Sequence, residues 1–77
     1  MRDQRLKDIV PFVVSVESGS FTAAAERLHV TSSAVSKSLA RLEDRLGSRL
    51  LERTTRTLKL TDAGKAYYQT CLRIMEE

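Results

Sequence analysis

Apolar residues recur along the first part of this chain with the spacing of an α-helix. Between positions 6 and 18 they are Leu6, Ile9, Val10, Val13, Val14 and Val16. Pro11 interrupts this pattern, and a proline inside a helix removes one hydrogen bond at a cost of about 3 kcal/mol. The helix therefore either begins close to Pro11 or bends there. We favour a kinked helix from about Leu6 to Ser18, with Gly19 as its left-handed cap.

A second, shorter amphipathic pattern occupies residues 21–29. Ser20 precedes it and can cap the helix by accepting a backbone N–H. The inward face is predicted to consist of Phe21, Ala24, Ala25 and Leu28. The small alanines allow a neighbouring helix to approach closely. In the short turn 29–31, Val30 is apolar enough to fill the gap between two helices.

The third pattern predicts a helix over about residues 32–46, with Thr31 as its cap and Gly47 at its end. Its buried face should carry Val35, Leu39, Leu42 and Leu46. The opposite face carries mainly short side chains and cations, namely Ser33, Ser36, Lys37, Ala40, Arg41 and Asp44. An ordinary surface helix would explain the charges, but serine is a weak helix former with no local reason to recur there.

Two short β-compatible runs, at residues 50–53 and 57–60, flank the polar residues 54–56. They predict a two-stranded hairpin with Arg56 near its tip. Thr61 and Asp62 then cap a last helix that runs to the end of the chain.

This last helix carries a wide apolar band, formed by Tyr67, Tyr68, Cys71, Leu72, Ile74 and Met75. The band covers about 160°, whereas a single packed face needs roughly 100°. The helix therefore either contacts two partners, its own core and a second helix, or forms one broad core face in a small domain.

Composition favours a compact helical fold, because the 42% apolar content is mostly aliphatic and the 77 residues include no Trp. We predict a mainly α winged helix-turn-helix with a three-helix core and a two-stranded wing, followed by a linker helix. The expected domains are 1–61, with the helix-turn-helix at about 21–40 and the wing at about 50–60, and the linker helix at 62–77. No apolar run approaches the ~18–20 residues that span a bilayer.

The positive charge is concentrated in one part of the chain. Residues 31–60 carry a balance of +4 and the remainder −1. The basic side chains of that part are Lys37, Arg41, Arg45, Arg49, Arg53, Arg56 and Lys59. A solvated surface would explain one charged helix alone. The coincidence with the helix-turn-helix pattern favours a polyanionic partner.

The sequence offers few residues for catalysis or metal binding. Both need several titratable side chains that converge on one site. His29 and Cys71 are the only residues of their types. A single cysteine also excludes an intrachain disulfide and fits a reducing cytoplasm. We therefore expect no enzyme activity, no metal and no cofactor.

The segments SGSFTAAAERL, AVSKSLARLEDRLGSRLLERTTR and LTDAG stand in an order and spacing similar to those of LysR-type transcriptional regulators. The chain resembles the N-terminal DNA-binding domain of that bacterial family over almost its whole length. The resemblance implies a dimer that binds double-stranded DNA at an inverted-repeat operator. It implies a third helix in the major groove, a wing in the minor groove, and a cytoplasmic, nucleoid-associated protein without a membrane partner.

Carried over residue by residue, the resemblance implies DNA contacts from Thr22, Thr31, Ser32, Ser33, Ser36, Lys37, Arg41, Arg53 and Arg56. Ser32 departs from the glutamine of many members, and serine accepts either base type, so no adenine preference is carried over. Arg56 is the stronger candidate for a narrow minor groove. Arg53 either binds phosphate or pairs with Glu43.

The resemblance also implies that the linker helix pairs antiparallel with its mate, through Tyr67, Tyr68, Cys71, Leu72 and Met75. Full-length members continue into an effector-binding domain of two α/β lobes that senses a small-molecule inducer. That domain is absent from this sequence, so we expect a DNA-binding fragment or a truncated product. The alternative is a winged-helix protein-interaction module without DNA binding. Such a module would be expected to lose outward cations such as Lys37 and Arg41, which are present.

Overall fold

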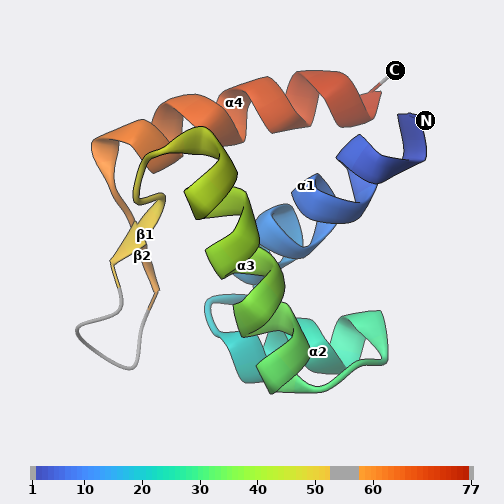
Figure 1. The fold of residues 1–77 in the computed structure, drawn as a ribbon. Helices are drawn as coiled ribbons and strands as arrows, with labels where there is room; N and C mark the ends of the chain where they lie inside the picture. Colours follow the sequence, from blue (N-terminus) through green and yellow to red (C-terminus); the bar gives the residue numbers. More distant parts are fainter. Residues whose placement is uncertain (1, 53–57, 77) are drawn as a thin grey trace.

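The computed structural model describes the backbone of residues 2–52 and 58–76, and within those ranges the side chains from Lys7 onward. The elements follow the order α1 (Arg2–Ser18), α2 (Phe21–Leu28), α3 (Ser32–Leu46), β1 (Leu51–Glu52), β2 (Lys59–Leu60) and α4 (Asp62–Glu76) (Figure 1). α1 packs against α2, α3 and α4, and β1 pairs antiparallel with β2. The predicted mainly α fold with a two-stranded sheet is confirmed.

Local capping signals set the ends of α2 and α3 where the sequence predicts them. The Oγ of Ser20 accepts the backbone N–H of Ala23 at 3.1 Å, and the Oγ1 of Thr31 accepts that of Ala34 at 3.0 Å. α3 ends at Gly47, whose φ of +71° is left-handed. Glycine adopts that conformation without Cβ strain, so the helix stops there.

Two predicted helix boundaries are corrected. α1 begins at Arg2, not near Leu6, and it continues through Pro11. The added residues are mostly polar residues of good helix propensity, so a starting point taken from the apolar pattern falls too late. α2 ends at Leu28, before His29, because His29 takes up a left-handed φ of +60°.

Two apolar residues are less buried than the sequence predicts. Val30 does not fill the gap between the helices, because it is 48% exposed in the turn after α2. Leu46 is 41% exposed, since it lies in the last turn of α3, beyond the buried Leu42. Both therefore present hydrocarbon to the surface.

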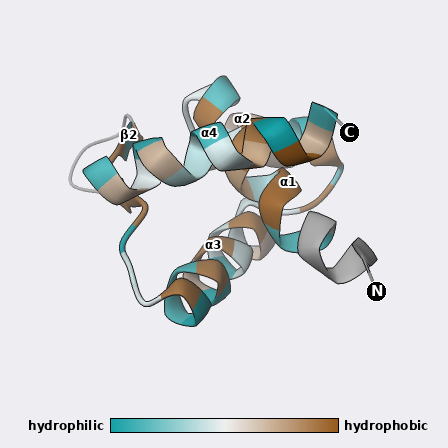
Figure 2. Ribbon diagram, turned by 90° about the horizontal axis from the view of Figure 1, so that it is seen from above, coloured by the Kyte–Doolittle hydropathy of each residue, from teal (hydrophilic) through white to brown (hydrophobic). Residues whose placement is uncertain are grey.

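The hydrophobic core joins α4 to the helix-turn-helix. Phe12 of α1 is fully buried, with its ring centroid 5.7 Å from that of Tyr67 and 6.2 Å from that of Tyr68. Figure 2 shows hydrophobic residues on α1 where it passes α4. Among the residues whose side chains are described, the other buried apolar ones are Ile9, Val13, Val14, Ala24, Ala25, Val35, Leu39, Leu42, Leu50, Leu51 and Cys71.

The strands hold the base of the predicted wing next to α4. Leu51 lies opposite Leu60, and Glu52 lies opposite Lys59. Each described strand has two residues, shorter than the predicted runs 50–53 and 57–60. Residues 53–57 lie outside the described part of the chain.

Thr61 caps α4, as predicted, by accepting the N–H of Gly64 at 2.9 Å through its Oγ1. Its backbone N–H donates to the carbonyl of Leu50 at 3.0 Å. A Cβ built on Gly64 would lie only 2.0 Å from the same Leu50 oxygen. Only glycine therefore permits this approach of α4 to the start of the wing.

Candidate nucleic-acid interface

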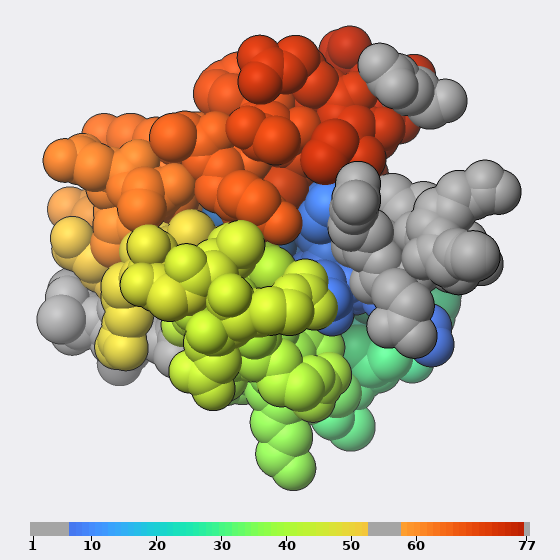
Figure 3. All heavy atoms as spheres, turned by 45° about the horizontal axis from the view of Figure 1, so that its top comes forward, coloured from blue at the N-terminus to red at the C-terminus, as the bar shows by residue number. Residues whose placement is uncertain are grey.

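The outward face of α3 is exposed and combines three small side chains with three charged ones, Lys37, Arg41 and Asp44. Val35, Leu39 and Leu42 are buried, whereas the predicted outer residues are exposed, apart from the half-buried Ser36. Figure 3 shows α3, in yellow-green, across the front of the molecule below α4. A helix with short outward side chains can bring its backbone close to base edges in a groove.

The two predicted cations of this face have different surroundings. Lys37 is exposed, and within the described residues its ammonium has no recorded partner. The guanidinium of Arg41 is exposed as well, and its Nη2 donates to the Oγ of Ser38 at 3.4 Å. Lys37 is therefore free to turn toward a ligand, while Arg41 is oriented along the helix.

The remaining described candidates lie at helix N-termini, where backbone N–H groups attract anions. Thr22 is exposed in the first turn of α2, and Ser32 and Ser33 are exposed in the first turn of α3. Thr31 is exposed too, although its oxygen already caps Ala34. These positions suit phosphate oxygens.

Arg53 and Arg56 lie outside the described residues, so the structure does not place the two predicted wing contacts. It does show what fixes the base of the wing. The Oε2 of Glu43, only 8% exposed, accepts the backbone N–H groups of Leu50 at 2.8 Å and Leu51 at 3.2 Å. The sequence suggests Glu43 only as a possible partner of Arg53. No pattern in it indicates these backbone donors, which come seven and eight residues later.

Not all of the basic side chains face outward for binding. Arg45, in the last turn of α3, forms an ion pair with Asp8 of α1. The two residues are separated by 37 positions, so no local sequence pattern indicates the pair. Arg45 therefore ties α3 to α1, and the positive charge on the outward face of α3 rests on Lys37 and Arg41, with the acidic Asp44 on the same face.

The predicted dimer residues of α4 divide into buried and exposed ones. Cys71 is fully buried in the domain's own core, so its side chain offers no surface to a partner. Tyr67, Tyr68 and Leu72 are half-buried, and Met75 is 42% exposed. Burial raises the pKa of the Cys71 thiol to about 11, despite a hydrogen bond with Tyr67 that lowers it. Burial also raises the pKa of Tyr67.

The described residues contain no group of three or more His, Cys, Asp or Glu side chains that could hold a metal ion. In the same ranges, no helix is both long and apolar enough to cross a lipid bilayer.

Within the described residues, three helices pack on a common core and a short antiparallel pair follows the third, an arrangement that defines the winged helix-turn-helix class. Residues 6–65 match the sequence model of a family described as bacterial regulatory helix-turn-helix protein, lysR family. The chain belongs to this family.

Curated relatives carry regulatory names. The chain is 47% identical over 74 residues to the HTH-type transcriptional activator AaeR of Escherichia coli K12, covering 96% of this chain and 24% of AaeR. It is 49% identical over 71 residues to the HTH-type transcriptional regulator CrgA of Neisseria meningitidis serogroup B, covering 92% of this chain and 24% of CrgA. The chain thus spans about a quarter of the length of these relatives.

Solved structures share the fold closely. The BenM DBD in its complex with catB site 1 DNA has a TM-score of 0.89 and 37% identity, covering 92% of this chain and 76% of that one. The CbnR DBD in its DNA complex has a TM-score of 0.87 and 38% identity, covering 91% of this chain and 80% of that one.

Proposed function

We propose that this chain is the sequence-specific double-stranded DNA-binding domain of a LysR-type transcriptional regulator. The observation that carries the proposal is the outward face of α3, where small side chains and two unburied cations meet. α3 enters the major groove, and the wing reaches the adjacent minor groove. Similar domains of BenM and CbnR are named as DNA complexes, which supports the proposal.

The proposed contacts divide into positioning and reading groups. Thr22, Thr31 and Ser33 bind phosphate at helix N-termini. Base edges in the major groove are read by Ser32, Ser36, Lys37 and Arg41. Arg56 enters the minor groove, as the family pattern implies, and Arg53 either binds phosphate beside it or pairs with Glu43.

We further propose a homodimer formed through α4. Tyr67, Tyr68, Leu72 and Met75 supply the contact, because they keep exposed surface after the core is formed. Cys71 is left out of this set because it is buried. A symmetric pair of domains fits an inverted repeat whose half-sites lie one helical turn, or a multiple of it, apart.

We also propose that the chain divides into a winged helix-turn-helix at 1–61 and a linker helix at 62–77. We further propose that it has no enzyme activity, in keeping with the regulatory names of the relatives. A DNA ligand places the protein in the cytoplasm, at the nucleoid.

The test is a fluorescence-anisotropy titration of the chain with a mixed pool of duplex DNA at two salt concentrations, followed by selection of the tightest sequences. We expect affinity that falls steeply with salt, because phosphate contacts release counterions. We also expect a strong preference for the selected duplexes. Absence of binding at low salt would favour the protein-interaction module.

A further inference from the structure

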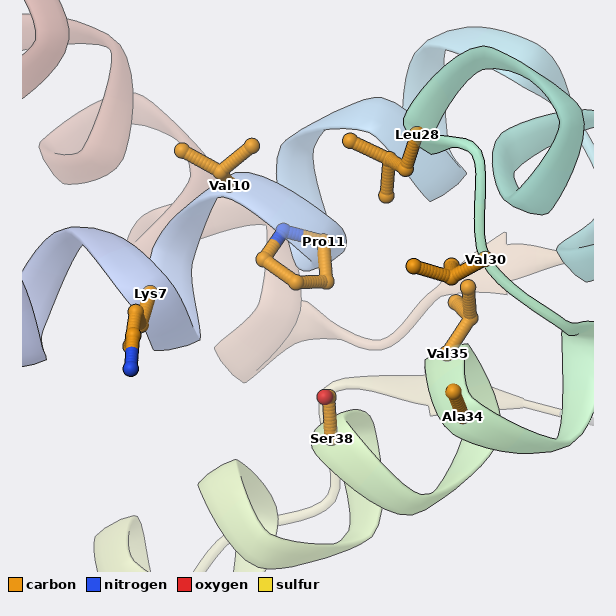
Figure 4. A pocket seen from close by; sticks show the side chains of 8 residues that line it. All are labelled: Lys7, Val10, Pro11, Leu28, Val30, Ala34, Val35 and Ser38. Atoms are coloured by element: carbon orange, nitrogen blue, oxygen red, sulfur yellow. The ribbon is translucent and has the colours of Figure 1, made fainter.

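A hollow of about 430 Å³ lies between α1, the turn after α2 and the first half of α3 (Figure 4). Most of its wall is hydrocarbon, supplied by Val10, Pro11, Leu28, Val30 and Val35. Val30, which is predicted to fill the gap between the two helices that its turn joins, is instead 48% exposed and lines this hollow. The volume is within the range of small-molecule sites, which are mostly apolar with a few polar groups.

The polar groups of the hollow come from two different helices. In Figure 4, Lys7 lies at one end of the hollow and Ser38 lies on the opposite wall, across from Pro11. Leu28 and Val30 lie at the other end. Lys7 is exposed, and among the described residues its ammonium has no recorded partner. The Oγ of Ser38 accepts from Arg41 at 3.4 Å, so its own O–H remains available to donate.

Among the residues whose side chains the structure describes, this wall contains donors and a positive charge and no acidic side chain. Asp8, next to Lys7 in sequence, is occupied by its ion pair with Arg45. A ligand that complements the hollow therefore has a negatively charged, hydrogen-bond-accepting head and an apolar body.

We propose that the hollow binds a small amphipathic carboxylate, such as a medium-chain fatty acid. The carboxylate lies between the Lys7 ammonium and the Ser38 hydroxyl, and the hydrocarbon covers Pro11 and Val30. Binding removes apolar surface from water and pairs an otherwise solvated cation. This site is distinct from the outward face of α3, and its occupancy does not depend on the proposed DNA binding.

Occupancy has a consequence that does rest on the proposed function. A carboxylate at Ser38 attracts the neighbouring Arg41 guanidinium, which is also a proposed DNA contact. The ligand and DNA then compete for one side chain. Binding of the carboxylate should weaken DNA affinity by about 5-fold, the lower end of usual coupling between two sites.

The site is tested without DNA, by following the amide ¹H–¹⁵N NMR spectrum of the chain during titration with octanoate. We expect saturable shifts at the amides that surround the hollow, with a Kd on the order of 1 mM for a ligand of this size. 1-Octanol, which has the same chain and no charge, should bind several-fold more weakly. Shifts that do not saturate, or equal binding of octanol, would overturn the proposal.

Variants locate the site. Lys7→Gln should weaken octanoate binding several-fold, while Lys65→Gln, which removes an exposed cation from α4, should leave it unchanged. Val30→Asp places a negative charge at the apolar end of an exposed turn and should abolish binding without unfolding the core. Unchanged binding in Lys7→Gln and Val30→Asp would show that octanoate binds elsewhere. If octanoate binds as expected but DNA affinity is unaffected, the competition through Arg41 is wrong and the site itself stands.

Discussion

Lys37 is the proposed DNA contact on α3 whose charged group is least constrained by its surroundings. It is exposed on the outward face, and no described side chain competes for its ammonium. Arg41, one turn later, shares its guanidinium with Ser38. The side chain of Lys37 is therefore less constrained than that of Arg41, although the helical periodicity places both on the same outward face.

Lys37→Ala should weaken binding to a selected duplex by about 1–3 kcal/mol if the ammonium contacts a base edge, and by less if it contacts phosphate alone. Loss of a base contact also relaxes the sequence preference. Loss of a phosphate contact instead reduces the slope of log affinity against log salt concentration by about one. Anisotropy titrations at several salt concentrations separate the two. Lys65→Ala, on α4, is the matched control. Unchanged affinity of a folded Lys37→Ala variant would contradict the assigned reading surface.

The buried thiol of Cys71 predicts a loss of stability at alkaline pH. Burial raises its pKa from about 9 to about 11, so the unfolded chain releases this proton at lower pH than the folded chain does. Unfolding is then favoured increasingly as pH rises from about 9 toward about 11. The raised pKa of Tyr67 acts in the same direction.

This effect is measured by urea unfolding at a series of alkaline pH values. Cys71→Ala removes the thiol and should lose part of the alkaline decline, although the variant is less stable at neutral pH because it leaves a small cavity. Parallel pH profiles for the two proteins would show that the thiol does not contribute.

At the scale of elements, the contact between α4 and the start of the wing depends on one glycine. Gly64→Ala would place a methyl group against the Leu50 carbonyl oxygen, where the Cβ lies at 2.0 Å. To remove this steric clash, α4 or the base of the wing must shift. We therefore expect the free energy of unfolding to fall by about 3 kcal/mol. Chemical denaturation measures it. Ala66→Ser, at an exposed position of α4, should change stability by less than about 0.5 kcal/mol.

The sequence predicts those features of the elements that are governed by neighbouring residues. Ser20, Thr31 and Gly47 act within one helical turn, and the structure confirms each of them. Contacts between distant segments were missed. Glu43 accepts N–H groups from the wing, and Arg45 pairs with Asp8, because packing of whole helices brings these groups together.

The same distinction applies to the candidate site. The periodicity of α3 correctly separates Val35, Leu39 and Leu42 from the outward residues, since a helix has a fixed turn angle. It fails at Leu46, because periodicity identifies a face but not how far along the helix the core extends. The DNA roles of individual residues came from the family resemblance, and they stay predictions.

At the scale of the whole molecule, the proposed dimer depends on apolar surface left on α4. Met75→Glu should dissociate the dimer, because it places a charge in the proposed contact while the core stays intact. Sedimentation equilibrium measures the association. The affinity for a duplex with two half-sites should fall far more than that for a single half-site, since the link between the two binding events is lost.

Gln69→Glu adds the same charge at an exposed position on a different side of α4 and serves as the control. Equal association of the Met75→Glu and Gln69→Glu variants with the unaltered chain would place the contact elsewhere.

The ring of Phe12 makes a tilted contact with Tyr67 and an edge-to-face contact with Tyr68, and these contacts fix α4 to α1. α1 in turn packs on α3. In a dimer, each α3 would therefore be held rigidly relative to the α4 of the same copy. The angle at which the two α4 helices cross then determines the distance between the two α3 helices along DNA. Changing that angle, without altering any DNA-contacting residue, would change which spacing of half-sites the protein selects.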